Sequence, residues 1–600
     1  MCYNIVDWGV VIFKLTVSKS KNAASFYVQK SVYYSETGVH SSKTIEKLGT
    51  EAELRATYPD QDPYEWAREY VAELNRLEKE KENQERDVLI KYSPVKQIPK
   101  GEQRSFNGGY LVLARIYHSL GLDKISKQIQ KRYKFTYDLD CILSRLVYSR
   151  IIYPASKLAT LRLSKRFIEP PNFDLQHIYR SLDVLEAESD FIQAELYKRS
   201  LSGLSSRNTG VLYYDCTNFF FEAQQADGLK QYSANGKDHK PNPLVQMGLF
   251  LDGDGIPLAF SITPGNRNEQ ITLRPLEQQI LSDFGLAKFI VCTDAGLSSD
   301  ANKRFNDMGE RAFVTTQSVK KLDKLLKGWV LFSDGWKLAG SQEVYDISNL
   351  YKKEDEQGYL DQEEYLDKIF YKERWVDTDG LSQRLIVTFS VKYRRYHRKI
   401  RAGHIARAYK LIQSRPARLK KSHSNDYRRF VQRKSFTSEG EEAKKTIFSI
   451  DQDLIAKEEI YDGFYAVYTN LEDDVETIIK INRRRWEIEE SFRIMKQEFK
   501  ARPAFLQKDV RIIAHFLTCF ISLLLFRYLE KLLGEKYTCC EIVDTLRQMN
   551  FLQAKGDGYI PTYTRTDLTD DLHTVLGERT DFEIVTTKQM KTVLKASKKK

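Results

Sequence analysis

The chain has 600 residues, of which 42% are hydrophobic and 12% aromatic, so it can bury several cores and is not a low-complexity protein. Lysine and arginine number 94 and aspartate and glutamate 82, a net charge of +12. This balance favours a polyanionic partner, although a generic basic cytosolic protein has the same balance.

Cysteine usage and one apolar segment limit the cellular setting. The seven cysteines are scattered and form no Cys-x-x-Cys pair, which predicts a reducing compartment and argues against a structural zinc site. The first residues lack the basic segment and cleavage site of a secretory signal. The apolar run 512–529 is interrupted by His515 and Arg527, among other polar residues, so we expect a buried core helix rather than a membrane span.

The first 206 residues divide into two predicted domains. Residues 1–50 alternate apolar and polar positions, which predicts a small sheet with hairpin turns, and a charged helix follows at 62–85. We therefore expect an N-terminal domain at 1–95 that could bind DNA. Helical periodicity then predicts a bundle at 96–206, which could bind DNA or support the domain that follows.

The next segment predicts an α/β domain. Strands are expected at 211–221, 244–251 and 256–262, then a helix, a strand at 289–293, a second helix and a strand at 311–315. Three antiparallel strands followed by helix, strand, helix and strand is the order of a ribonuclease-H-like sheet. We assign this catalytic domain to 207–316 and 461–535.

Two acidic residues belong to this predicted sheet. Asp215 lies inside the first strand and Asp294 ends the fourth, and in a ribonuclease-H-like sheet those strands are neighbours. Two carboxylates at one edge repel each other, and a divalent cation offsets the repulsion. Each acid alone could instead be structural; together they predict a metal site.

A strongly basic segment interrupts the predicted catalytic domain. We expect 317–460 to be a β-rich insertion that does not continue the sheet. From Val391 to Lys434 there are sixteen lysines and arginines against one acid, Asp426, with interspersed tyrosines. This pattern favours contact with a phosphodiester backbone over a merely solvated helix face. The candidate contacts are Arg394, Arg395, Arg398 and Lys399.

After a strand at 461–469, one long helix is predicted to carry the remaining site residues. Ile488, Phe492, Met495 and Phe499 form its buried stripe. A neighbouring face presents one carboxylate among polar and basic side chains, namely Asn482, Arg485, Glu489 and Lys496. Ordinary Arg–Glu pairing on a surface helix is the alternative. Residues 536–600 are expected to form a polar C-terminal region ending in a flexible basic tail.

These motifs resemble DDE transposases of bacterial insertion sequences, in the insertion-sequence-four superfamily. Arg485, Glu489 and Lys496 match the spacing of the signature Tyr-x2-Arg-x3-Glu-x6-Lys, while Asn482 replaces its tyrosine. Asp215 in Tyr-Tyr-Asp-Cys-Thr and Asp294 in Thr-Asp-Ala-Gly-Leu-Ser look like the first two acids. Phrases such as Gly236-Lys-Asp-His-Lys-Pro and Pro264-Gly-Asn also look like this group.

The resemblance implies a function and a set of roles. Asp215, Asp294 and Glu489 would be the catalytic and metal-binding acids and would hold two Mg²⁺ ions, for which Mn²⁺ can substitute. Arg485, Lys496 and Asn482 would contact DNA. The reaction implied is cut-and-paste transposition, in which element ends are cut and their 3′-OH is joined to target DNA, in some members through a hairpin end.

The implied partners are double-stranded DNA, as terminal inverted repeats and target, and a second copy of the chain in a synaptic complex. The implied location is the bacterial cytoplasm, at the nucleoid and not at a membrane. A stand-alone Mg²⁺-dependent nuclease and a catalytically inactive DNA-binding derivative remain alternatives. The sequence does not specify the terminal repeats, the target preference or which N-terminal region reads DNA.

Overall fold

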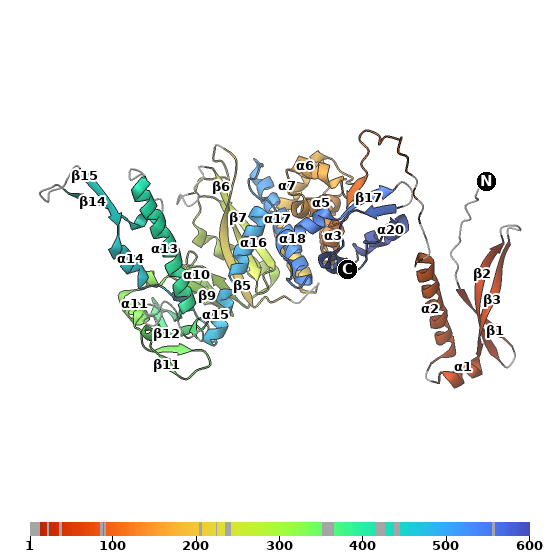
Figure 1. Cartoon of the computed structure of the whole chain (residues 1–600), viewed down its shortest axis with the longest axis horizontal. Coiled ribbons are helices and arrows are strands. Elements are labelled where there is room, and N and C mark those ends of the chain that lie inside the picture. Colours follow the sequence, from red (N-terminus) through yellow and green to blue (C-terminus); the bar gives the residue numbers. More distant parts are fainter. Residues whose placement is uncertain are drawn as a thin grey trace. The chain divides into compact units, whose positions relative to one another are not determined.

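The computed structural model describes residues 13–20, 23–34, 39–59, 61–84, 88, 90, 92–202, 207–223, 225–233, 242–350, 365–414, 426–436, 445–554 and 558–599. The motif Gly236-Lys-Asp-His-Lys-Pro lies outside these residues. The chain forms two compact units, Met1–Gln97 and Ile98–Lys600 (Figure 1).

The first unit is a three-stranded antiparallel sheet with two helices. The strands are β1 (Phe13–Lys19), β2 (Ala24–Tyr34) and β3 (Val39–Thr50), in the order β1-β2-β3. Helices α1 (Glu51–Thr57) and α2 (Pro63–Gln84) follow, and α2 packs against β1. The core contains Phe26, Leu54 and Ala67. The small sheet and the charged helix predicted from alternation and periodicity are therefore confirmed.

The second unit begins with β4 (Ser105–Asn107) and a group of helices around one apolar helix, α17 (Asp509–Leu532). It packs against α3, α5 and α7, and 94% of its most apolar 18-residue stretch is buried inside the protein. The prediction of a core helix rather than a membrane span is confirmed. The helices of this group that precede the large sheet are α3 (Tyr110–Ser119), α4 (Leu122–Gln130), α5 (Leu139–Ile152), α6 (Lys157–Ser164), α7 (Leu175–Ala187) and α8 (Ser189–Leu201).

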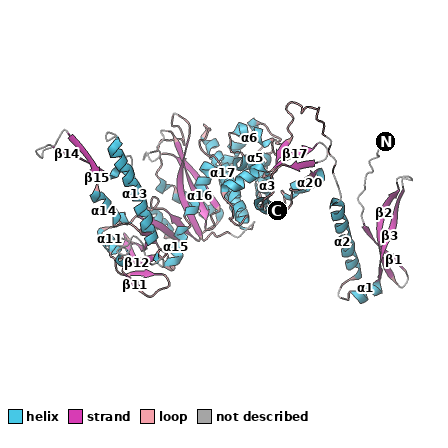
Figure 2. Ribbon diagram, viewed as in Figure 1, coloured by secondary structure: helices cyan, strands magenta, loops and turns pink. Residues whose placement is uncertain are grey.

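The central feature of the second unit is a ten-stranded mixed sheet in the order β11-β10-β12-β13-β16-β9-β8-β5-β6-β7 (Figure 2). β5 pairs antiparallel with β6 and parallel with β8, as the sequence predicts. Helices between the strands include α9 (Leu273–Gln279) and α10 (Asp300–Asn306). The strands predicted for the catalytic domain are β5 (Val211–Phe220), β6 (Leu244–Asp252), β7 (Pro257–Pro264), β8 (Phe289–Thr293), β9 (Arg311–Gln317) and β16 (Phe464–Thr469).

One prediction about the segment 317–460 is wrong, because part of it continues the sheet. β13 (Leu381–Phe389) pairs antiparallel with β16, and β12 (Phe370–Thr378) pairs with β13. The pairing gives β16 a hydrogen-bonded neighbour on each side, so its backbone is not an open edge. The other described elements of this segment are β10 (Trp336–Leu338), β11 (Val344–Tyr345), α11 (Lys324–Leu331), α13 (Val391–Ser414), β14 (Val431–Phe436), β15 (Lys445–Ile450) and α14 (Gln452–Glu459).

The long helix predicted after β16 is instead two helices, α15 (Val475–Arg483) and α16 (Trp486–Gln497). Arg484 and Arg485 form a turn between the two helices: their dihedral angles stay in the right-handed helical region, but hydrogen bonds to the third preceding residue interrupt the α-helical pattern. Behind the break, the Arg527 guanidinium forms a buried ion pair with Glu487 and donates to the Gly255 carbonyl at 3.1 Å. This pairing fixes the start of α16 against α17 and the β6–β7 turn.

The C-terminal residues fold back onto the start of the second unit. β17 (Asn550–Ala554), β18 (Gly558–Pro561) and β19 (Val585–Thr586) form a sheet with β4, alongside α18 (Cys539–Gln548), α19 (Asp567–Leu576) and α20 (Thr587–Ala596). Lys598 pairs with Glu169 at 2.6 Å. The prediction of a flexible tail is therefore wrong up to residue 599, because buried contacts of α20 hold the segment in place.

Candidate active site

Asp215 lies on β5, the central strand predicted to carry the first acid. Its Oδ1 accepts a hydrogen bond of 2.8 Å from the backbone N–H of Cys216. Burial and the negative charge of Asp294 together raise the pKa of Asp215 to about 7, although the Cys216 hydrogen bond and the nearby Arg485 lower it. A nearby positive charge therefore stabilises the ionised form of the Asp215 carboxyl group.

Asp294 follows β8, the parallel neighbour of β5. The last aligned pair of these two strands is Tyr213 and Cys292, and each aspartate lies two residues beyond that pair. Adjacent strands are about 4.8 Å apart and side chains alternate faces, so both carboxylates share one face of the sheet. The backbone N–H groups of Gly296 and Leu297 donate to Asp294 Oδ1 at 2.8 and 3.2 Å, which fixes its orientation.

Arg485 provides the positive charge among the acids. It occupies the break between α15 and α16, and its Nη2 lies 3.5 Å from Glu489 Oε1, one helical turn along α16. Burial favours the neutral guanidine, but Tyr465, Glu489 and Asp294 together raise the pKa of Arg485. One guanidinium therefore interacts with Glu489, Asp294 and Asp215.

Glu489 is the most exposed of the three acids, with 61% of its side chain accessible. Among the described residues, the ligand atoms of Asp215, Asp294 and Glu489 do not all lie within 4.8 Å of one another. The structure thus brings the two aspartates together on the sheet and places Glu489 beside the arginine that both aspartates share.

Lys496 and Asn482, the other predicted contacts on these helices, face the same sheet. Lys496 Nζ donates to the Thr217 hydroxyl, two residues after Asp215, and lies 5.5 Å from the centre of the Phe219 ring. Asn482 lies on α15, before the break, and its amide donates to the Tyr465 hydroxyl at 3.0 Å. The predicted helix face therefore contacts β5 through Lys496 and β16 through Asn482.

A pocket of about 360 Å³ opens beside Glu489. Its walls come from β13, β16, α15, α16 and the first turn of α13. The polar and aromatic part of its lining includes Tyr393, Tyr465, Asn482, Arg485, Trp486 and Glu489. Trp486 is 58% exposed, so this wall of the pocket reaches the protein surface.

The predicted basic contacts lie on α13, which begins at this pocket. Arg398 and Lys399 are exposed, and Arg394 and Arg395 are partly buried. Other cations of the segment have structural partners: Arg401 bonds to Asp462 at 2.7 Å and Arg429 to Glu458 at 2.9 Å. The basic segment therefore divides into a part that holds α13 in place and a part that faces solvent. Residues 415–425 lie outside the described residues.

Comparison with known proteins identifies a family. The Transposase DDE domain family matches residues 209–525, slightly more than half of the chain, and the match includes all three acids. The chain belongs to this family. Among solved structures, it is similar to a piggyBac transposase in a synaptic complex with hairpin DNA, with 7% identity and a TM-score of 0.34 over 81% of this chain and 90% of that chain. No curated protein sequence matches it.

One residue of the DDE domain that sequence analysis missed is Glu269, at the start of the short helix η1 (Glu269–Ile271). Its negative charge contributes to the raised pKa values of Asp215 and Cys216. Its carbonyl accepts from the Thr272 hydroxyl at 2.7 Å, and that hydroxyl also contacts Tyr214 at 2.8 Å. The only sequence signal is an isolated acid after a Gly-Asn turn, which is indistinguishable from a solvated glutamate.

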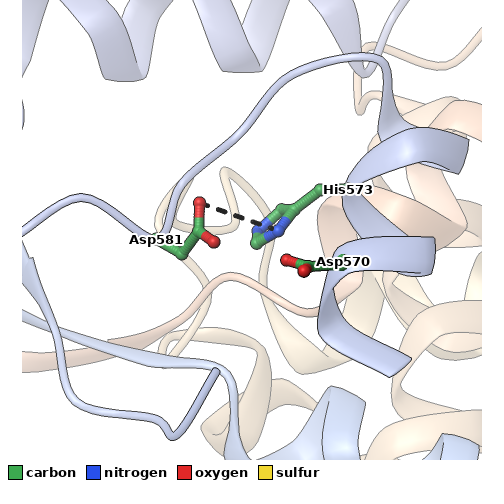
Figure 3. A group of neighbouring side chains, drawn as sticks. All are labelled: Asp570, His573 and Asp581. Atoms are coloured by element: carbon green, nitrogen blue, oxygen red, sulfur yellow. Dashed lines mark ion pairs between the residues drawn. The ribbon is translucent and has the colours of Figure 1, made fainter. Parts of the chain in front are cut away.

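A second acidic cluster lies outside the matched part of the DDE domain family. Among the described residues, Asp570, His573 and Asp581 are the group whose ligand atoms all lie within 4.8 Å of one another (Figure 3). Arg565 Nε donates to Asp570 at 3.0 Å, and Arg579 Nε donates to Asp581 at 2.9 Å. Two guanidinium groups already balance two carboxylates, so this cluster does not fit a cation.

The donor set of the DDE domain does fit a divalent cation. Asp215 and Asp294 are neighbouring carboxylates with hard oxygen ligands, and burial together with the charge of Asp294 raises the pKa of Asp215. The Arg485 guanidinium interacts with all three acids. The residues present therefore have the chemistry of a metal site, unlike the cluster around His573.

Proposed function

We propose that the chain is a cut-and-paste transposase in which Asp215, Asp294 and Glu489 hold two divalent cations, Mg²⁺ in the cell with Mn²⁺ able to substitute. The observation that supports this most strongly is the convergence of three acids from β5, β8 and α16 on the Arg485 guanidinium, inside the region that matches the DDE domain. Three carboxylates carry more negative charge than one arginine can neutralise, so they attract a further cation.

The proposed division of labour follows from each residue's position. Bound cations would activate a water molecule or a 3′-hydroxyl and stabilise the leaving oxygen of a phosphodiester. Asp215 and Asp294 hold their positions on adjacent strands, while Glu489 on α16 would exchange its Arg485 contact for the metal site. Arg485 then becomes available to a DNA phosphate, with which its guanidinium can form paired hydrogen bonds.

The DNA path that we propose runs from Lys496 past Arg485 and the Trp486 pocket to α13. Lys496 lies near Thr217 on β5, and Asn482 borders the pocket. Arg394, Arg395, Arg398 and Lys399 extend the basic surface along α13. Such a path would neutralise successive phosphates and orient the scissile one at the acids.

The partners and setting in this proposal are those of an insertion-sequence transposase. The DNA partners are the terminal inverted repeats of an element and a target duplex. Because two ends must be cut and joined together, the proposed assembly is a homodimer in a synaptic complex. The proposed location is the bacterial cytoplasm, at the nucleoid.

Purified protein incubated with Mg²⁺ and a duplex carrying the inverted repeats that flank the coding sequence tests this function. We expect cleavage at the repeat ends and joining of the 3′-OH to a supercoiled target plasmid. Asp215→Asn protein is the matched control and should bind the duplex without cutting it. Cutting without joining, or cutting regardless of end sequence, would instead identify a stand-alone nuclease.

A further inference from the structure

The first unit carries a sheet face that its own helices leave open. Leu15, Val17, Phe26 and Val28 point toward α1 and α2, and Phe26 and Val28 are fully buried. Because side chains alternate along a strand, the residues between them point to the opposite face. No element among the described residues of this unit packs on that opposite face.

The open face presents three rows of polar side chains across β1, β2 and β3. The register aligns Lys14 with Gln29 and Gln29 with Thr44; the next row is Thr16, Tyr27 and Lys47. Gln29 is held in place, because Thr16 donates to its amide oxygen at 3.0 Å and its amide nitrogen donates to Thr44 at 3.3 Å. The third row consists of Ser18, Ser25 and Thr50.

Charge is segregated between the two layers of this unit. The described strand residues include five lysines and a single glutamate, Glu46, which accepts from Tyr70 of α2 at 3.2 Å and so faces the helices. The described helical residues carry eight glutamates and five cations, and Glu65, Glu69 and Glu73 are exposed. Lys14 and Lys47 lie on the open face, where no described acid lies, whereas Lys19, Lys30 and Lys43 lie on the side that carries the glutamates of the helices. A polyanion is therefore attracted more to the open face than to the helical side.

We propose that this open face, centred on Lys14, Tyr27, Gln29 and Lys47, binds double-stranded DNA in the major groove and supplies end recognition for the proposed transposase. Lysines at two corners of the face would contact phosphates of both strands. Between them, Gln29 presents both an amide oxygen and an amide nitrogen, the pair of groups that reads an adenine edge. Antiparallel strands enter the major groove in other DNA-binding proteins, so the geometry is permitted. The role in end recognition rests on the proposed function, whereas DNA binding by this face does not.

The test compares two double variants of the full-length protein. Lys14→Ala with Lys47→Ala removes two charges from the open face. Lys19→Ala with Lys43→Ala removes two charges from the same strands on the covered side, where Lys19 lies over Tyr64 and Lys43 is aligned with Lys30. Binding is measured without metal by fluorescence anisotropy, on a duplex taken from the DNA flanking the coding sequence, across a salt series.

The open-face double variant should reduce the slope of log affinity against log salt by about 2, and the covered-face double variant should leave it unchanged. Gln29→Ala should reduce the preference for the flanking duplex over a scrambled duplex by about tenfold. Equal behaviour of the two double variants would overturn the inference. Cleavage of the same duplex with Mg²⁺ is scored separately, so failure of the proposed chemistry is distinguishable from failure of this surface.

Discussion

Two clusters of acids in this protein have opposite electrostatic character. At Asp570 and Asp581, Arg565 and Arg579 match the carboxylates, and their hydrogen bonds lower the pKa of Asp570 to about 2 and lower that of Asp581. At Asp215, burial and Asp294 raise the pKa to about 7, and Arg485 only partly compensates. The number of guanidinium groups per carboxylate, rather than the number of acids, therefore separates a structural ion network from a site suited to a cation.

The largest expected effect on cleavage comes from removing an acid of the DDE site, with removal of an acid around His573 as the comparison. Asp215→Asn, Asp294→Asn or Glu489→Gln should reduce DNA cleavage by about three orders of magnitude or more while leaving DNA binding largely intact, because each would lose a metal ligand. Asp570→Asn is the matched control and should cleave at nearly the normal rate. Single-turnover cleavage and anisotropy measure the two properties, and a variant that kept cleavage would remove that residue from the site.

The next effect concerns pH. Because the carboxyl of Asp215 is protonated below about pH 7, a proton competes with a cation there. Mn²⁺ affinity measured by calorimetry should rise by about tenfold per pH unit up to about pH 7 and then level off. Asp581→Asn protein should show the same profile. A flat profile in the unmodified protein would mean that Asp215 is not a ligand.

In the metal-free protein, ionised Asp215 should lower the thermal stability of the folded state. The folded-state pKa of Asp215 lies above its ordinary value of 3.8, so its favourable contribution is present at low pH and is lost as pH rises through about 7. Asp215→Asn should therefore raise the Tm by about 1–2 °C at pH 8, by less at pH 5, and leave it nearly unchanged below its unfolded pKa of 3.8. Asp581→Asn should lower the Tm at pH 8, because it breaks an ion pair. Thermal scans with a chelator present test both signs.

The smallest expected effect comes from Glu269, which acts on Asp215 through its charge. Glu269→Gln should shift the midpoint of the pH profile of Mn²⁺ binding downward by less than about one unit, because it removes one negative charge near Asp215. Asp283→Asn, on the following helical segment, is the matched control and should not shift it. An unchanged midpoint in the Glu269 variant would mean that its carboxylate lies too far from Asp215 to matter.

Local sequence patterns predict much of the ten-stranded sheet but not its extension by β12 and β13. The alternation around Asp215 and the apolar strand before Asp294 predict β5 and β8, and their parallel pairing follows from the order of elements. The segment 317–460 was recognisable as β-rich, but alternation does not reveal with which strand β12 or β13 pairs. Their addition beside β16 depends on contacts between distant segments.

The candidate site was predictable in composition but not in geometry. The spacing of Arg485, Glu489 and Lys496 marks them from the sequence. The turn at Arg485 has no proline or glycine to announce it, and the buried Arg527–Glu487 pair beside it joins segments that are distant in the sequence. Glu269 was missed for the same reason, since only the folded turn brings it to β5.

The central claim is that Asp215, Asp294 and Glu489, and not the acids around His573, hold divalent cations. The most direct test is a crystal structure of the protein soaked in Mn²⁺, with manganese located by anomalous scattering. We predict manganese bound at about 2.1 Å to carboxylate oxygens of Asp215, Asp294 and Glu489, with Arg485 released from Glu489. Manganese at Asp570 and Asp581 instead, or Glu489 still paired with Arg485 beside a metal-free Asp215, would contradict the account.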